Sequence, residues 1–401
     1  MNTHIAQYND ENSVINRLKL PVYNKATISS TLSARGPSTT FMGTKPSQST
    51  VRAPLSNISN QPARQAPIAP KNYVAKVPIS STTQTIQAPT SVPSTFKQPQ
   101  PAVRQITPAV IHVPHFVTRN PPESPKIDSQ YSNDPQHVTE FTHDIMEHYQ
   151  RIELKYMPSS NYMEKQAEIN TTHRAIVVDW LSQLHYQWKM LPDTIYLCVN
   201  IMDRFLSIKA VSRDRFQQLA VTCLLIACKY EEICCPAIKA LVNAAGDQFT
   251  VEEVIRMERI VLSNLDFNVT VATLYPFLKR YLKCGRCEEN MDVVWTTQYI
   301  CEMSLSEYQS LQYTPSMMAC SAIYLANRLN NVENPWNRNL EYYTGRQVSD
   351  IMPCVKFLWD SLKNQNRNSK LMTVKKKFAS VRRNEVTKLV LKAIASANLV
   401  L

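Results

Sequence analysis

Glycine is scarce in this sequence, which contains 5 glycines among 401 residues, and only 3 of them lie beyond residue 130. Because tight β-hairpins usually need glycine in their turns, we do not expect a β-sheet fold in that part. The sequence also has no glycine-rich phosphate loop and neither an H-E-x-x-H nor a G-x-S-x-G motif. These absences argue against an enzyme, and no cofactor is expected.

Long hydrophobic runs are also missing. No segment reaches the roughly 18–20 apolar residues that a membrane-spanning helix needs. The first residues lack the basic and apolar regions of a secretion signal. We therefore expect neither secretion nor a membrane partner.

Cysteine is absent from the first 197 residues, and all 10 cysteines follow. Two spacings are suggestive: the adjacent pair Cys234 and Cys235, and the C-x-x-C of Cys284 and Cys287. A lone C-x-x-C without a second pair or a histidine pair is weak evidence for zinc. Free or buried thiols are predicted, with no disulfide framework and no metal site.

Proline and charge divide the chain into two parts. Residues 1–130 hold 17 of the 25 prolines, and their 13 Lys and Arg against 4 Asp and Glu leave a net charge of +9. Such a segment cannot bury enough apolar surface to offset the entropy lost on ordering. Residues 1–130 are therefore predicted to be a disordered basic arm, and the roughly 270 residues after it are expected to fold.

Apolar residues beyond the arm recur at helical spacing, which predicts an all-α fold. The segment Gln217–Cys228 is apolar almost all round, as is typical of a helix inside a bundle. Thr250 and Glu253 have the spacing of a capping box. Helices are predicted at about 138–154, 172–190, 193–208, 213–230, 236–245 and 251–264.

A loose internal repeat follows. LLIACK (Leu224–Lys229) recurs as IYLANR (Ile323–Arg328), 99 residues later. Both segments end a stretch rich in small and apolar residues. The repeat indicates two copies of a five-helix unit, at about 168–268 and 270–365, with a basic tail at Thr373–Arg383.

Several motifs in this order resemble those of the cyclin box. They are HRAIVVDWL (His173–Leu181), LPDTIYLCVNIMDRFL (Leu191–Leu206), CKYEEICCP (Cys228–Pro236) and RMERIVLSNLDF (Arg256–Phe267). The stretch from residue 137 to 383 is similar to cyclins of the mitotic B type, and TVKKKFAS (Thr373–Ser380) resembles the tail of that type.

The resemblance implies two tandem five-helix cyclin folds, at 137–268 and 270–383, with an extra helix before the first. It also implies a function: a non-catalytic subunit that binds and activates a cyclin-dependent kinase at the entry into mitosis, in the nucleus and cytoplasm. The substrates of the kinase would be further partners.

A lysine that ends an apolar helix, and a glutamate on the next amphipathic helix, suggest a charged clamp on a partner protein. By resemblance, Lys229 and Glu258 contact the kinase near its αC helix, where charge-assisted hydrogen bonds are roughly twice as strong as neutral ones. The apolar contacts that the resemblance implies are Ile145, Tyr230, Leu262 and Phe267. Without the resemblance, a lysine in this position more often extends into water.

A substrate-docking groove is the second site that the resemblance implies. Ile176, Val177 and Trp180 recur at one-turn spacing, a pattern that fits a core stripe as well. Val177 replaces the family's leucine and His173 its methionine, so we expect weakened or altered recruitment of Arg-x-Leu substrates. The implied groove residues are His173, Ile176, Val177, Trp180, Arg213 and Gln217.

Two charged residues in this region are expected to have a structural role. By the family pattern, Arg174 and Asp203 pair with each other inside the fold. Breaking a buried ion pair costs about 3–5 kcal/mol.

The arm carries a short linear motif. RAPLSNISN (Arg52–Asn60) fits the destruction box R-x-x-L-x-x-[IV]-x-N through Arg52, Leu55, Ile58 and Asn60. A flexible segment can enter a receptor groove in extended form, with the arginine as a charged contact and the leucine as an apolar anchor. The motif predicts a ubiquitin ligase as a partner.

Two rival functions remain open. A non-mitotic cyclin, such as a transcriptional one, would have the same folded part. Tandem cyclin folds also occur in transcription factors that bind nucleic acid, and a net charge of +12 favours phosphate contacts. Those factors usually carry an N-terminal zinc ribbon, and most of the positive charge here lies in the arm, so nucleic acid is not expected.

Overall fold

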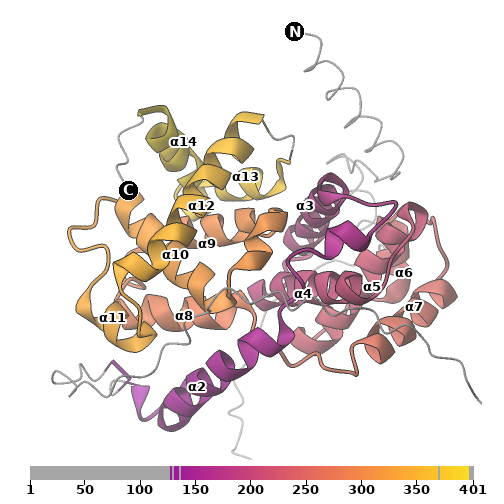
Figure 1. Ribbon diagram of the computed structural model, residues 1–401, viewed down its shortest axis with the longest axis horizontal. Coiled ribbons are helices and arrows are strands. Elements are labelled where there is room, and N and C mark those ends of the chain that lie inside the picture. The colour runs from indigo at the N-terminus through magenta and orange to yellow at the C-terminus, as the bar shows by residue number, and fades with distance from the viewer. Residues whose placement is uncertain (1–126, 129–130, 135–136, 369–370, 397–401) are drawn as a thin grey trace, which may run out of the picture. The chain divides into compact units, whose positions relative to one another are not determined.

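The computed structural model describes residues 127–128, 131–134, 137–368 and 371–396, without the side chains of residues 366–368 (Figure 1). Most of the predicted arm, including its destruction box, lies outside these residues. Within the described part the regular structure is helical and contains no strand. The all-α prediction is therefore confirmed.

The first bundle surrounds one buried helix. This helix, α5, packs against each of the other four helices of the bundle, and every residue from Phe216 to Cys228 within it is buried. The prediction of an interior helix is confirmed. The bundle consists of α3 (Thr171–Gln187), α4 (Pro192–Ile208), α5 (Arg213–Glu231), α6 (Ile238–Ala244) and α7 (Val251–Asn264).

Local sequence sets the ends of these helices. Thr250 and Glu253 form the capping box predicted for α7, and Pro192 occupies the first turn of α4. The helix predicted at 172–190 is shorter than expected, because Lys189 adopts a left-handed φ of 53° that ends it.

The second bundle repeats the arrangement around α10. This helix packs against α8, α9 and α12, and it ends with the IYLANR segment that the repeat singled out. Two five-helix units are thus present. The bundle consists of α8 (Leu274–Cys284), α9 (Met291–Ser304), α10 (Pro315–Leu329), α11 (Arg338–Thr344) and α12 (Val348–Asn368).

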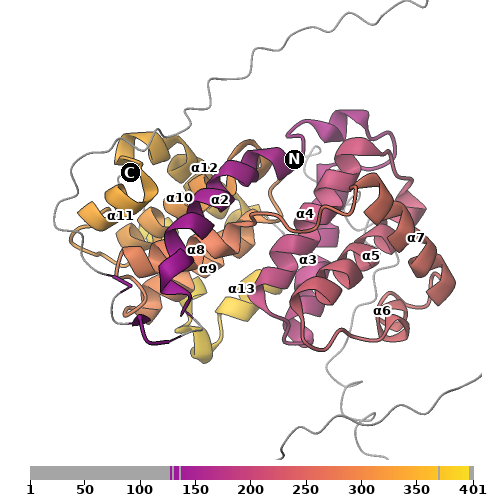
Figure 2. The same cartoon turned by 90° about the horizontal axis from the view of Figure 1, so that it is seen from below.

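Helix α2 (Thr142–Glu153) precedes the first bundle but is held on the second, and Figure 2 shows it lying across α8 and α10. The ring of Tyr149 meets that of Phe277 edge-on, with centroids 6.2 Å apart. The Glu153 carboxylate accepts hydrogen bonds from the backbone N–H of Ser316 at 2.9 Å and from its hydroxyl at 2.8 Å. These contacts hold α2 on the second bundle.

The C-terminal segment is folded beyond the predicted end of the second domain at residue 383. Helix α13 (Thr373–Phe378) packs on α3 and α9, and α14 (Val386–Ser396) packs on α9 and α10. Lys377 is buried in α13 and reaches both carboxylate oxygens of Glu302 at 2.6 Å. The predicted basic tail is therefore an integral part of the core.

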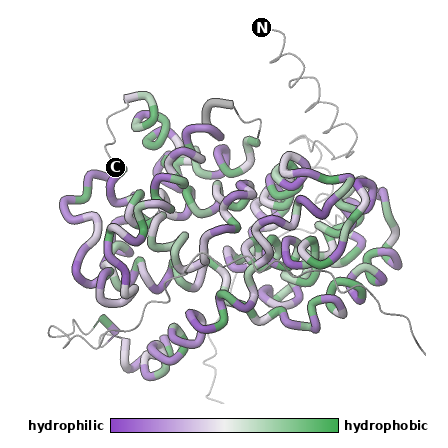
Figure 3. The backbone as a smooth tube through the Cα atoms, in the orientation of Figure 1, coloured by the Kyte–Doolittle hydropathy of each residue, from purple (hydrophilic) through white to green (hydrophobic). Residues whose placement is uncertain are grey.

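Short 3-10 helices join the longer elements. Figure 3 shows hydrophobic and hydrophilic residues interspersed along the backbone of both bundles. Among the described helices, none combines the length and apolar character that a membrane span requires. The 3-10 helices are η4 (Thr139–Phe141), η5 (Leu154–Tyr156), η6 (Tyr162–Lys165), η7 (Tyr308–Gln312) and η8 (Val381–Arg383).

The last residues assigned to the disordered arm have fixed contacts. Ile127 is buried, and the Asp128 carboxylate receives two hydrogen bonds from Arg280, at 2.8 and 2.9 Å. Partial burial raises the pKa of Asp128, but Arg280 and Lys283 outweigh it and leave the pKa below its usual value. The prediction of disorder up to residue 130 is wrong for these two residues, because α8 supplies the cations that hold them.

Candidate functional site

Lys229 and Glu258 lie together on the surface of the first bundle. Lys229 is in the last turn of α5 and Glu258 is in α7, and the Nζ–Oε1 distance is 2.6 Å. The Lys229 side chain is 48% exposed and the Glu258 side chain 13%. The ammonium of Lys229 is half exposed and can turn to a partner, whereas the Glu258 carboxylate is mostly buried.

Large apolar side chains are exposed on the elements that carry this pair. Phe267 is 67% exposed and Tyr230 46% exposed, although the Tyr230 hydroxyl bonds to that of Thr270 at 2.7 Å. Ile145 of α2 is 38% exposed, while Leu262 packs partly against the core. An exposed apolar surface of this kind is a candidate interaction site. We call Ile145, Lys229, Tyr230, Glu258, Leu262 and Phe267 the clamp face.

Three further exposed apolar residues belong to the same elements and were not predicted. Ile233 is fully exposed just after α5, and Ile260 is 46% exposed on α7 beside Glu258 in the chain. Phe141 is 52% exposed one turn before Ile145. The four-residue spacing of Phe141 and Ile145 was a readable signal, whereas nothing in the local sequence distinguishes Ile233 and Ile260 from core residues.

Acidic groups gather next to the clamp face. Burial raises the pKa of Glu231, and repulsion from Asp193 and Glu232 adds to the rise. Burial likewise raises the pKa of Asp193. Glu232 accepts hydrogen bonds from the backbone N–H of Leu191 at 2.7 Å and from the hydroxyl of Thr194 at 2.5 Å. This carboxylate therefore fixes the end of α5 to the start of α4 and positions Lys229.

Arg174 and Asp203 form a buried pair away from the surface. Nε and Nη2 of Arg174 donate to the two carboxylate oxygens of Asp203 at 2.8 and 2.7 Å. Nη1 donates to the backbone carbonyl of Leu305 at 2.9 Å, and the Tyr162 hydroxyl donates to Asp203 at 2.7 Å. Every charge is satisfied inside the fold, so the pair connects the two bundles and is not available to a ligand.

The predicted groove residues lie mostly within the core. His173, Val177, Trp180 and Gln217 are buried, whereas Ile176 and Arg213 are partly exposed. His173 closes the capping box of α3: its backbone N–H donates to the Asn170 side chain at 3.0 Å, and its Nδ1 accepts from the Asn170 backbone N–H at 3.1 Å.

Gln217 differs from the other buried polar groups of this region. Neither its Nε2 nor its Oε1 has a hydrogen-bond partner among the described residues. Leaving a buried amide unsatisfied costs about 1–3 kcal/mol. This cost would be recovered if an incoming backbone reached the amide.

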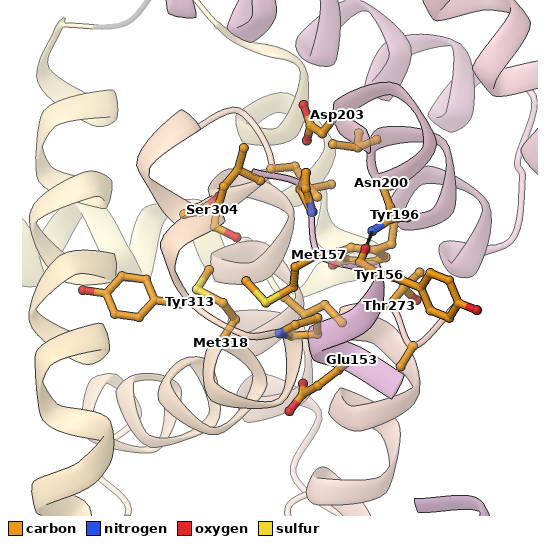
Figure 4. A pocket seen from close by; sticks show the side chains of 18 of the residues that line it. Glu153, Tyr156, Met157, Tyr196, Asn200, Asp203, Thr273, Ser304, Tyr313 and Met318 are labelled. Atoms are coloured by element: carbon orange, nitrogen blue, oxygen red, sulfur yellow. Dashed lines mark hydrogen bonds between the residues drawn. The ribbon is translucent and has the colours of Figure 1, made fainter. Parts of the chain in front are cut away.

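A cavity of about 100 Å³ is lined by residues of both bundles (Figure 4). Met157 and Met318 lie in its lining, and Asn200 donates to the backbone carbonyl of Tyr156 at 3.2 Å beside it. The charged side chains in the lining are Glu153, Arg174 and Asp203, and all three already bond to other residues of the fold. The charged groups of the cavity are therefore engaged within the fold.

The cysteines do not gather into a ligand set. Cys284 and Cys287 are buried, and the Cys287 thiol lies 3.8 Å from the side-chain oxygen of Asn327. Across the described residues, no three His, Cys, Asp or Glu side chains come together as metal ligands would.

Comparisons with known proteins give a consistent result. The chain matches the family model of the cyclin N-terminal domain over residues 144–270 and that of the cyclin C-terminal domain over residues 272–391. Cyclin-A1-4 of Oryza sativa subsp. japonica is 40% identical over 237 residues, which are 58% of this chain and 66% of that protein. G2/mitotic-specific cyclin-B of Dictyostelium discoideum is 38% identical over 261 residues, 65% of this chain and 59% of that protein.

The chain therefore spans between 59% and 66% of the length of these two relatives. Among solved structures, a viral cyclin from herpesvirus saimiri has a TM-score of 0.48 and 20% sequence identity. That match covers 52% of this chain and 92% of the viral protein.

Proposed function

Because the chain belongs to the cyclin family, we propose that it is a non-catalytic regulatory subunit that binds and activates a cyclin-dependent kinase. The observation that carries the proposal is the clamp face. The Lys229 ammonium and the Glu258 carboxylate, which are 2.6 Å apart, stand among exposed apolar side chains. Such a surface can accept and donate charge-assisted hydrogen bonds while the apolar groups supply buried area.

The clamp works through position rather than chemistry. Kinase catalysis requires that a Lys–Glu pair of the kinase be in place, which depends on how its αC helix is held. Lys229 would donate to backbone carbonyls of that region, and Glu258 would accept from backbone N–H groups. The two groups must first separate from each other, and the half-exposed Lys229 is the one that can turn outward.

Exchanging the two charges tests this function directly. In the double variant Lys229→Glu, Glu258→Lys the intramolecular ion pair is kept, so the free energy of unfolding should stay within about 0.5 kcal/mol of the original chain. The exchange swaps the positions of the positive and the negative charge that face the kinase. Truncating or opposing such contacts costs about 2–5 kcal/mol of binding free energy. Kinase binding should therefore weaken by more than about tenfold, and phosphorylation by the co-purified kinase should fall.

The matched control is the exchange Lys239→Glu, Asp247→Lys. This pair is also exposed, with an Nζ–Oδ1 distance of 3.2 Å, and it lies at α6 of the same bundle. It should leave kinase binding unchanged. Full kinase activation by the chain with exchanged Lys229 and Glu258 would refute the proposed clamp.

We further propose that the kinase complex acts at entry into mitosis and is of the B type. The proposal rests on the sequence motifs and on the relative named G2/mitotic-specific cyclin-B. We also propose that the protein resides in the nucleus and cytoplasm, which is what the resemblance to mitotic cyclins implies. Abundance that stays constant through the cell cycle would instead favour a non-mitotic cyclin.

Degradation through the arm is a separate proposal. The motif Arg52–Asn60 lies outside the described residues, and its fit to the destruction box supports recognition by a ubiquitin ligase. The variant Arg52→Ala, Leu55→Ala should persist late in mitosis, when the original chain disappears. Unchanged turnover of that variant would remove the proposal.

Substrate docking at Ile176, Trp180 and Gln217 is likewise proposed. The unsatisfied amide of Gln217 supports it, because the backbone of an Arg-x-Leu peptide could complete its hydrogen bonds. Peptide binding should weaken in Trp180→Ala and also in Gln217→Met, which keeps the volume but removes the amide. Equal binding by Gln217→Met and the original chain would contradict the assignment.

A further inference from the structure

The loop between α5 and α6 contains two adjacent thiols. Of the ten cysteines in the chain, Cys234 and Cys235 are exposed and the other eight are buried. Burial protects a thiol from reagents in water, whereas exposure makes it accessible. A reagent that attacks thiols therefore meets this pair first.

Both ends of this loop are anchored, but its middle is not. Glu232 is held by the two hydrogen bonds to Leu191 and Thr194 described above, and α6 begins at Ile238. Between them Ile233 is fully exposed, so no other part of the described chain packs on it. The thiols thus lie in a short segment that can change conformation without disturbing the core.

The loop also lies next to the charged pair of the clamp face. Burial raises the pKa of the Cys235 thiol, Lys229 opposes this rise, and Glu258 and Glu232 add to it. The Cys235 sulfur is therefore within electrostatic reach of both Lys229 and Glu258.

We propose that Cys234 and Cys235 form a dithiol modification site, which a small disulfide of the glutathione class converts to an intramolecular disulfide. The Cys234 thiolate attacks the disulfide, forms a mixed disulfide and releases one thiolate. The Cys235 thiolate then attacks the Cys234 sulfur, forms the second S–S bond and releases the other thiolate. The two cysteines lose two electrons and two protons, and the oxidant becomes two thiols.

Because the two cysteines are adjacent in the chain, a disulfide between them would be strained and easily reduced. Neighbouring Cα atoms are about 3.8 Å apart across a trans peptide, whereas disulfides usually join Cα atoms about 4.4–6.8 Å apart. Closing the ring must therefore rearrange the loop and strain it. Strained and exposed disulfides are the ones that are easily reduced and regulatory. The effect on kinase binding rests on the proposed function, because the rearranged loop is continuous with Lys229.

Peptide mass mapping of the full chain tests the modification without any kinase. After treatment with oxidised glutathione and capping of free thiols, the tryptic peptide Tyr230–Lys239 should have lost the mass of two hydrogen atoms. Reduction should restore it, and the eight buried cysteines should remain unmodified. In Cys234→Ser and Cys235→Ser the same treatment should leave a glutathione adduct. A stable glutathione adduct in the original chain, or no reaction, would overturn the proposal.

Kinase binding by the same samples tests the consequence. Oxidation should weaken binding of the original chain by about tenfold or more, reversibly, and should not affect the double variant Cys234→Ser, Cys235→Ser. If the oxidised chain binds as tightly as the reduced one, the regulatory part of the proposal is wrong. If the reduced chain binds no kinase, the proposed function fails, while the mass measurement still decides the dithiol chemistry.

Discussion

At the scale of single residues, Arg174 shows how a full positive charge can stand in the core. It is 1% exposed, yet three of its nitrogens donate to Asp203 or to the carbonyl of Leu305. Leu305 follows α9, so one side chain holds together residues of both bundles. A buried ion can be accommodated only when its partners are complete.

Removing the cation alone should therefore be costly. Arg174→Met leaves the Asp203 carboxylate buried without its counter-ion, and we expect the free energy of unfolding to fall by about 3–5 kcal/mol. Urea denaturation followed by circular dichroism measures this. Lys239→Ala, which breaks an exposed pair, serves as the control and should change stability by less than about 0.5 kcal/mol. Equal effects of the two variants would contradict the structural role of Arg174.

At the scale of elements, α2 is held by one buried carboxylate. Glu153, the last residue of α2, is 6% exposed, and its carboxylate bonds to Ser316 in the first turn of α10. Burial raises the pKa of Glu153, although the two bonds from Ser316 oppose the rise. The helix that carries Ile145 to the clamp face thus depends on a contact with the other bundle.

Substitution of Glu153 should loosen α2 and remove a pH dependence. Glu153→Ala leaves the buried N–H of Ser316 unsatisfied, so we expect the free energy of unfolding to fall by about 1–3 kcal/mol. Hydrogen exchange in residues 142–153 should become faster. The folded chain holds the Glu153 proton to a higher pH than the unfolded chain does. Its contribution to stability is therefore fully present below about pH 4.3 and is lost as the pH rises through the folded pKa.

Glu153→Gln keeps the volume and an acceptor but cannot titrate. The free energy of unfolding of Glu153→Gln should therefore not show this decrease above about pH 4.3. As the pH rises, the original chain should lose stability relative to Glu153→Gln. Parallel stability curves for the two chains would show that Glu153 does not titrate differently in the folded state.

The C-terminal helices act as part of the core. Val374 and Phe378 of α13, and Val386 and Val390 of α14, are buried. Truncation after residue 370 should therefore cost several kcal/mol, since each buried apolar side chain contributes about 1.5–3 kcal/mol, and the melting temperature should fall. Truncation after Ser396, which removes 5 residues, is the control. An unchanged melting temperature in the longer truncation would contradict the packing of α13 on α3 and α9.

At the scale of the whole molecule, the proposed clamp face draws on elements that are held by both bundles. Lys229, Tyr230 and Phe267 come from the first bundle, whereas Ile145 is carried by a helix that is anchored on the second. The clamp face is therefore complete only when the bundles are joined. On this proposal, Arg174, which joins the two bundles, and Glu153, which holds α2 on the second bundle, would support binding without touching the partner.

An exposed aromatic side chain of the clamp face should matter for binding and little for folding. Phe267→Ala is expected to raise the Kd for the kinase by about tenfold or more and to change the free energy of unfolding by less than about 0.5 kcal/mol. Tyr342→Ala is the matched control, because Tyr342 is 41% exposed on α11 of the second bundle. Titration calorimetry with purified kinase compares them, and equal affinities of both variants would exclude Phe267 from the interface.

The amino-acid sequence by itself determined the helices and their repetition. Apolar periodicity located α5 and α7, the Thr250–Glu253 spacing located a cap, and the LLIACK and IYLANR segments located the two central helices. These features depend on residues a few positions apart, where backbone geometry dictates which side chains share a face. The same local motifs singled out Lys229 and Glu258 as the predicted kinase contacts.

Only the tertiary structure decided which distant groups meet. The bonds from Ser316 to Glu153 span 163 residues, and the ion pair of Lys377 with Glu302 spans 75. A sequence shows that such charges exist but not that burial makes them partners. For this reason the basic tail became a core element and the predicted groove became largely buried. The exposure of Ile233 and of the two neighbouring thiols was likewise set by packing elsewhere in the chain.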